Sequence, residues 1–107
     1  MVAYTNERMK KALRKYLKQV NKYFKIEKAI LFGSRARDDY FLDSDVDLII
    51  VSHDFEDIDF RERISELLRW WDEPIDLEVI GYTPDEFERK KKQIGLVNNA
   101  VKEGIEI

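Results

Sequence analysis

Two aspartates, Asp45 and Asp47, stand at the start of the most apolar run of the chain, which continues as LIIV. Residues two apart on a β-strand point to the same face, so a strand here would place both carboxylates side by side. Like charges this close repel, and a buried pair needs protonation, cationic partners or a metal ion. Oxygen ligands without histidine or cysteine favour Mg²⁺ or Mn²⁺, which often lie between carboxylates and a substrate phosphate. The plainer alternative, carboxylates in water at a turn, suits Asp43 but explains Asp47 poorly.

A Gly-Ser pair, Gly33 and Ser34, ends the preceding apolar segment. Because Gly33 has no side chain, a phosphate can approach its backbone, and Ser34 can donate from its hydroxyl and its backbone N–H. The same pair would also suit an ordinary turn. Arg35 and Arg37 follow; they could pair with a triphosphate as forked donors, or could be surface charges on a short helix.

The elements that must position these residues can be predicted from the apolar pattern. Apolar residues from Met9 to Phe24 recur at three- and four-residue spacing, which predicts an amphipathic helix. We expect strands over residues 26–32, 46–51 and 75–80. The second of these is apolar at both parities, so it should be central and covered on both faces. A turn or short helix over 34–39 and a helix over 58–71 should connect them.

A last helix is expected to begin after Thr83, because Pro84 follows it and Glu86 stands three residues after it, as in a capping box. Four apolar residues should form its buried stripe: Phe87, Ile94, Val97 and Val101. The whole order predicts an α/β fold with a small mixed sheet of about three strands flanked by helices. The length of 107 residues predicts a single domain over residues 1–107.

The strand order also predicts the position of a third carboxylate. If Gly33 and Asp45 are neighbours, the first two strands run antiparallel. A helix joins the second and third strands, and a crossover of this kind makes them parallel. Asp76, at the start of the third strand, then lies at the same sheet edge as Asp45 and Asp47 and completes a site able to hold two metals. Glu78 shares the face of Asp76 but lies two residues deeper, so Asp76 is preferred.

The composition limits the function classes. Nineteen Lys and Arg against 22 Asp and Glu give a net charge of -3, so the chain lacks the positive field of a protein that coats nucleic acid. The basic run over residues 89–92 would spread around a helix, and we expect it to be a solvated face. The absence of cysteine excludes disulfides, thiolate metal sites and thiol nucleophiles. No segment approaches the roughly 20 apolar residues of a membrane span, and we expect a soluble, cytoplasmic protein.

The spacing of Gly33 and Ser34, ten intervening residues, and then Asp45 and Asp47 resembles the signature of the DNA polymerase beta-like nucleotidyltransferase superfamily. The string GSRARDDYFLDSDVDLII is similar to its minimal branch, the MNT-type domains, and the resemblance covers nearly the whole chain. It implies the nucleotidyltransferase fold and the transfer of a nucleoside monophosphate, such as AMP from ATP, to a hydroxyl with Mg²⁺ or Mn²⁺. One departure is Asp38, where many relatives carry glycine.

The same resemblance assigns roles to individual residues. Gly33 and Ser34 correspond to the residues that hold the nucleotide phosphates, and Asp45 and Asp47 to metal ligands. Asp76 becomes the third carboxylate, which is a metal ligand and the candidate base for the attacking hydroxyl.

Minimal domains of this type are often paired with a small helical HEPN protein, a ribonuclease toxin, so the resemblance implies an antitoxin. In one version the antitoxin transfers AMP to a toxin tyrosine. In another it is a catalytically idle nucleotide-binding protein that neutralises its partner by contact. A third alternative is transfer to a small molecule such as an aminoglycoside. Because the sequence keeps all three carboxylates and the Gly-Ser pair, the enzyme is favoured, although the acceptor and the nucleotide base are not identified.

Overall fold

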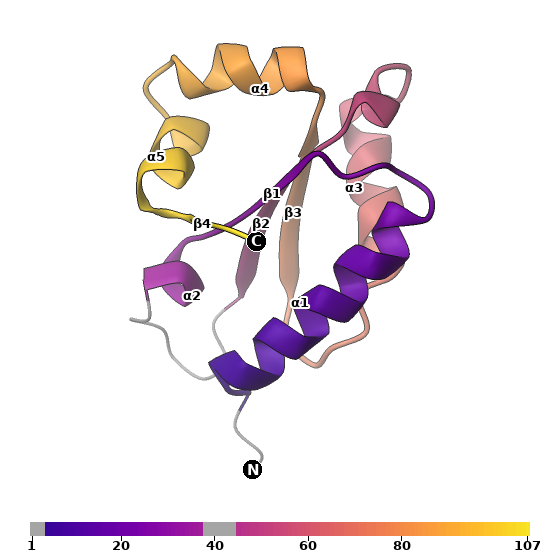
Figure 1. Ribbon diagram of the computed structural model, residues 1–107, viewed down its shortest axis with the longest axis vertical. Helices are drawn as coiled ribbons and strands as arrows, with labels where there is room; N and C mark the ends of the chain where they lie inside the picture. The colour runs from indigo at the N-terminus through magenta and orange to yellow at the C-terminus, as the bar shows by residue number, and fades with distance from the viewer. Residues whose placement is uncertain (1–3, 38–44) are drawn as a thin grey trace.

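The computed structural model describes residues 4–37 and 45–107 of the chain (Figure 1). Its elements are, in chain order, α1 (Asn6–Asn21), β1 (Lys28–Phe32), α2 (Ser34–Arg37), β2 (Val46–Val51), the short 3₁₀ helix η1 (His53–Phe55), α3 (Phe60–Leu68), β3 (Leu77–Tyr82), α4 (Pro84–Lys91), α5 (Leu96–Glu103) and β4 (Ile105–Glu106). Within these described ranges, no helix is long and apolar enough to cross a membrane.

The strands form one mixed sheet in the order β3-β2-β1-β4. β1 pairs antiparallel with β2, and β2 pairs parallel with β3, as the sequence predicts. The central position of β2 is also confirmed, and five of its six residues are buried. The two-residue strand β4, which pairs antiparallel with β1, was not expected. Among the described residues the sheet therefore has four strands, one more than the approximate number predicted.

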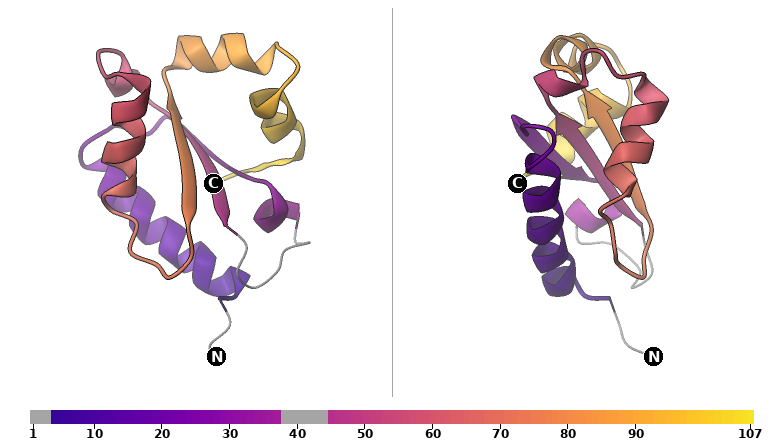
Figure 2. Two further views of the ribbon diagram at one scale, coloured as in Figure 1. Left: turned by 180° about the vertical axis from the view of Figure 1, so that it is seen from behind. Right: turned by 90° about the vertical axis from the view of Figure 1, so that its right-hand side faces the viewer.

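Helices cover both faces of this sheet, giving three layers (Figures 1 and 2). On one face the apolar side of α1 packs, together with Leu67 of α3, against Leu48 and Ile50 of β2. On the other face Phe87 of α4 and Val97 of α5 pack against Ile49 of β2. The side chains of β2 thus alternate between two cores, which is why its sequence is apolar at both parities.

The single last helix of the sequence prediction is wrong, because the chain forms two helices, α4 and α5. Thr83 and Glu86 make the expected capping box at the start of α4. The helix ends at Lys91, however, and Gly95 has a φ of 156°, a backbone conformation that favours glycine. Ile94, expected in the buried stripe, lies in the connection and is fully exposed, and Val101 is 45% exposed. Phe87 and Val97 are buried as predicted.

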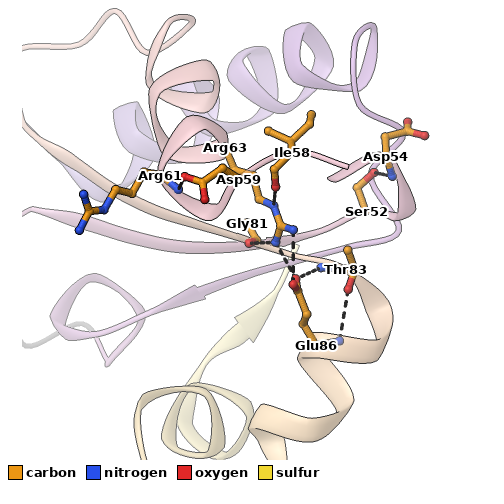
Figure 3. Close-up of polar contacts among 9 residues, drawn as sticks. All are labelled: Ser52, Asp54, Ile58, Asp59, Arg61, Arg63, Gly81, Thr83 and Glu86. Carbon is orange, nitrogen blue, oxygen red and sulfur yellow. Dashed lines mark hydrogen bonds and ion pairs between the residues drawn. The ribbon is translucent and has the colours of Figure 1, made fainter. Parts of the chain in front are cut away.

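A buried arginine joins α3, β3 and α4 (Figure 3). Arg63 is 4% exposed; its Nε donates to the carbonyl of Ile58 at 2.8 Å and its Nη1 to the carbonyl of Gly81 at 3.1 Å. Nη1 also donates to Glu86 Oε1 at 2.6 Å, and the same oxygen accepts from the backbone N–H of Thr83 at 2.8 Å. Burial alone would raise the pKa of Glu86, but the hydrogen bonds from Arg63 and Thr83 outweigh it and lower that pKa. This network fixes α4 at the end of the sheet where β3 ends.

Candidate active site

The turn after β1 brings the backbone of Gly33 against Asp47. Gly33 has a φ of 75°, in the left-handed region, and its carbonyl accepts from the backbone N–H groups of Ala36 at 3.1 Å and Arg37 at 3.2 Å, which closes the single turn of α2. A Cβ atom at Gly33 would overlap Asp47 Oδ2. Glycine is therefore required here for two reasons, the backbone conformation and the close approach of a carboxylate.

Strand register explains why Asp47 occupies the centre of the site. Asp47 pairs with Phe32 of the antiparallel strand β1 and with Glu78 of the parallel strand β3. Paired residues on neighbouring strands share a face of the sheet, so all three side chains lie on one side. Ile49 also lies on this face, in the core covered by α4 and α5. The carboxylates of the candidate site therefore lie on the α4 and α5 side of the sheet, at the end of β2 where that strand begins.

The environment of Asp47 strongly disfavours its charged form. Partial burial, a side-chain hydrogen bond with Glu78 and the negative charges of Glu78 and Asp45 raise the pKa of Asp47 to about 7, while the positive charge of Arg37 opposes the shift. A carboxyl group with this pKa is half protonated near neutral pH. Protonated Asp47 can therefore donate a hydrogen bond to Glu78.

Asp45 and Asp76 lie at the same edge of the sheet, as the sequence predicts. Each stands directly before its strand, and the backbone N–H of Val46 donates to the carbonyl of Asp76 at 2.9 Å. Glu78, the alternative that sequence reasoning set aside, is the carboxylate that the register places next to Asp47. Within residues 4–37 and 45–107, no three histidine, cysteine, aspartate or glutamate side chains lie close enough together to form a metal-binding group. The metal-binding roles of Asp45, Asp47 and Asp76 stay predictions.

Arg35 lies in the interior of the protein, in contact with Tyr4. It is 2% exposed; its Nη1 donates to the backbone carbonyl of Tyr4 at 3.0 Å, and its guanidinium lies 5.4 Å from the centre of the Tyr4 ring. The expectation of a surface charge is wrong for Arg35, because these contacts bury it beside the segment that precedes α1. Its pairing with a triphosphate stays a prediction that the contacts do not favour.

Arg37 has the opposite placement, at the exposed end of α2. Its Nη1 lies 3.8 Å from Glu103 Oε2 on α5, and its charge acts on Asp47 in the opposite sense to the neighbouring carboxylates. It is thus a cation between Asp47 and α5, and its contact with phosphates stays a prediction. Asp38 and Asp43, which the sequence analysis also singled out, lie outside the described residues.

Comparison with known proteins shows the family and the fold of the chain. The family model of the nucleotidyltransferase domain matches residues 13–106. A crystal structure of a candidate nucleotidyltransferase from Sulfolobus solfataricus superposes with a TM-score of 0.70 at 24% sequence identity, covering 94% of this chain and 80% of that one. At this identity the likeness shows the fold. No curated protein matches the sequence. Because the family model spans most of the chain, including every element that carries the candidate site, the protein belongs to the nucleotidyltransferase domain family.

Proposed function

We propose that this protein is a metal-dependent nucleotidyltransferase that moves a nucleoside monophosphate, in particular AMP from ATP, to a hydroxyl acceptor. The observation that carries the proposal is the approach of the Gly33 turn to Asp47. In this approach the backbone of Gly33 lies directly beside Asp47, a carboxyl group whose pKa is raised to about 7 by burial and by the neighbouring Glu78 and Asp45. A nucleoside triphosphate held by that turn would have its α-phosphorus next to these carboxylates.

The donor atoms of these carboxylates suit a hard divalent cation, although no three of them among the described residues lie close enough to form a metal-binding group. Asp45, Asp47 and Glu78 offer oxygen donors only, and the negative charges that raise the pKa of Asp47 are the ones that a cation would neutralise. Asp76 lies at the same sheet edge and is the further donor that the sequence predicts. When bound, Mg²⁺ or Mn²⁺ would supply charge neutralisation between these carboxylates and the phosphates.

The residues of the chain itself would bind the phosphates and accept the proton of the acceptor hydroxyl. The backbone at Gly33 and the hydroxyl of Ser34 hold the outer phosphates, with Arg37 as a nearby cation. The acceptor oxygen attacks the α-phosphorus, a new P–O bond forms, and the bond from that phosphorus to the oxygen of the leaving pyrophosphate breaks. The proton of the acceptor hydroxyl passes to a carboxylate, for which Asp76 and Glu78 are the two candidates.

We further propose that the acceptor lies on a protein partner of the HEPN type, so that the protein is an MNT-type antitoxin. The support for this step is the resemblance of GSRARDDYFLDSDVDLII to MNT-type domains. In this proposal the transfer requires both the carboxylate site and the partner, because the partner supplies the hydroxyl. AMP attached to that hydroxyl adds negative charge and bulk at the surface of the toxin.

The test uses labelled ATP, Mg²⁺ and a HEPN protein encoded beside this gene. The wild type should label the partner with a mass gain of one AMP per modified hydroxyl, and the Asp45→Asn/Asp47→Asn variant should not. Asp57→Asn/Asp85→Asn is the control, because it removes the same charge from exposed positions near the opposite ends of the strands. Should the Asp45→Asn/Asp47→Asn variant still silence the toxin, neutralisation would be by contact. Efficient transfer to RNA or an aminoglycoside without any partner would refute the antitoxin proposal alone.

A further inference from the structure

A recess adjoins the candidate site on the side away from β3. It has a volume of ≈ 360 Å³, and Phe32, Gly33 and Arg37 form one side of it. The other side is a stripe of α5 that includes Leu96 and Asn99. Figures 1 and 2 show α2 and α5 beside each other at this end of β1. The volume falls within the roughly 300–1,000 Å³ that small-molecule sites occupy.

The recess is continuous with the place proposed for the phosphates. Gly33 belongs to both, since it lines the recess and approaches Asp47. Phe32 pairs with Asp47 in the β1–β2 register, so its side chain lies on the same face of the sheet as the carboxylates. A nucleotide whose phosphates lie at Gly33 therefore has an adjoining recess for its remaining part.

The lining of the recess suits a nucleobase. Phe32 and Leu96 provide apolar surface for the flat face of a base, and Leu96 is 48% exposed, so its apolar area is available for burial. The one amide of the lining, that of Asn99, offers both a donor and an acceptor. An asparagine amide can bond the N6 and N7 edge of adenine with two hydrogen bonds.

The side chain of the neighbouring Asn98 has a different role from that of Asn99. Asn98 Nδ2 donates to the carbonyl of Lys91 at 2.9 Å and so ties α5 to the end of α4. Asn99 is exposed on the recess side, and within the described part of the chain no hydrogen bond occupies its amide. The two adjacent residues thus have the same side chain, one used in the fold and one available to a ligand.

We infer that the recess between β1 and α5 binds the nucleoside of the substrate and that Asn99 recognises its base, with adenine preferred. This inference rests on the proposed function, because it takes the phosphates to lie at Gly33. Leu96 and Phe32 hold the base by its face, and Asn99 selects it by its edge. Selection by Asn99 would make ATP the preferred nucleoside triphosphate.

The experiment measures binding of ATP, GTP, CTP, UTP and inorganic tripolyphosphate, each with Mg²⁺, by calorimetry. The wild type should prefer ATP, and Asn99→Ala should weaken ATP binding about tenfold and remove the preference, leaving tripolyphosphate unchanged. Leu96→Ser should weaken all four nucleotides but not tripolyphosphate. Asn98→Ala is the matched control and should keep the preference, and thermal melts establish that each variant is folded.

Three outcomes would overturn the inference, and they are distinguishable. If tripolyphosphate and ATP bind but Asn99→Ala leaves the affinities and base preference unchanged, the nucleoside lies elsewhere and the proposed function stands. If neither ATP nor tripolyphosphate binds the wild type with Mg²⁺, the proposed function fails and the inference fails with it. A wild type that binds all four nucleotides equally refutes base recognition by Asn99.

Discussion

Asp47 and Glu78 lie side by side on the parallel strands β2 and β3, and the contact between their carboxyl groups contributes, with burial, to raising the pKa of Asp47 from 3.8 to about 7. The folded state therefore holds a proton between these pH values that the unfolded chain releases. The stability that neutral Asp47 contributes is fully present below pH 3.8 and is lost as the pH rises through about 7. Ionised Asp47 therefore makes the folded, metal-free protein less stable than protonated Asp47 does.

Asp47→Asn should therefore stabilise the metal-free protein at pH 8, because the amide carries no charge beside Glu78 and Asp45. The gain should shrink toward pH 4, where Asp47 is protonated in the wild type. Urea denaturation of both proteins across this pH range, in the presence of a chelator, measures the difference. Asp57→Asn is the control at an exposed position. A gain that does not depend on pH would contradict the assignment of the shift to Asp47.

Addition of Mg²⁺ at pH 8 should stabilise the wild type and not the Asp45→Asn/Asp47→Asn variant. A cation that binds only the folded state, and whose free concentration is about 100 times its dissociation constant, adds about 2.7 kcal/mol to the free energy of unfolding. The measurement is thermal unfolding against Mg²⁺ concentration, with NaCl at matched ionic strength as the control for screening. An equal shift in both proteins would show that the cation does not use these carboxylates.

The face and sheet edge of the candidate site can be predicted from sequence because both follow from local rules. Strand parity places Asp45 and Asp47 on one face, and the helical crossover makes β2 and β3 parallel. The register between these strands is not local. A shift of two residues would place Asp76 beside Asp47 in place of Glu78 while keeping every apolar side chain on its face, so the hydrophobic pattern cannot distinguish the two.

Other differences between prediction and structure have similar causes. The break at Gly95 was missed because an isolated glycine is tolerated within a helical pattern, and only the packing of α5 against the sheet shows that the chain turns there. β4 has two residues, too few for a periodicity. Arg35 is buried by Tyr4, a residue distant in sequence, and no spacing rule connects the two.

Gly33→Ala should destabilise the protein by more than Gly95→Ala. Both glycines have a positive φ, a backbone region in which a residue other than glycine costs of order 1–3 kcal/mol. At Gly33 the added Cβ would also overlap Asp47 Oδ2, whereas nothing lies within 4 Å of a Cβ at Gly95. Chemical denaturation gives the two changes in unfolding free energy. In a double-mutant cycle, Asp47→Ala should stabilise the Gly33→Ala protein more than it stabilises the wild type, by the part due to overlap. Equal effects in both backgrounds would mean that backbone strain alone is responsible.

Arg63→Met should destabilise the protein by about 1–3 kcal/mol, because it removes the donor of two backbone carbonyls and leaves Glu86 without its partner. The pKa of Glu86 is lowered in the folded protein, so its charge adds to the free energy of unfolding, and this contribution is lost as the pH falls through that lowered pKa. Glu86→Gln should therefore remove this part of the pH dependence of the free energy of unfolding. Thermal and urea unfolding at pH 7 and pH 4 measure both effects. The control Glu88→Gln, at an exposed i,i+3 ion pair on α4, should change the melting temperature little. Equal effects of Glu86→Gln and Glu88→Gln would contradict the structural role of the buried network.

Asp76→Asn and Glu78→Gln separate the two candidates for the third carboxylate, because each substitution keeps the size of its side chain and removes only the charge. If Asp76 takes the proton of the acceptor, Asp76→Asn should lower kcat by about 10²–10⁴-fold with little change in ATP binding. Glu78→Gln should then retain activity but change the pH profile, since it removes the neighbour that raises the pKa of Asp47. The measurements are single-turnover transfer rates and ATP affinity, each from pH 5 to pH 9. If Glu78→Gln is inactive and Asp76→Asn is active, then Glu78, the strand partner of Asp47, accepts the proton of the acceptor hydroxyl, and Asp76 at the sheet edge does not.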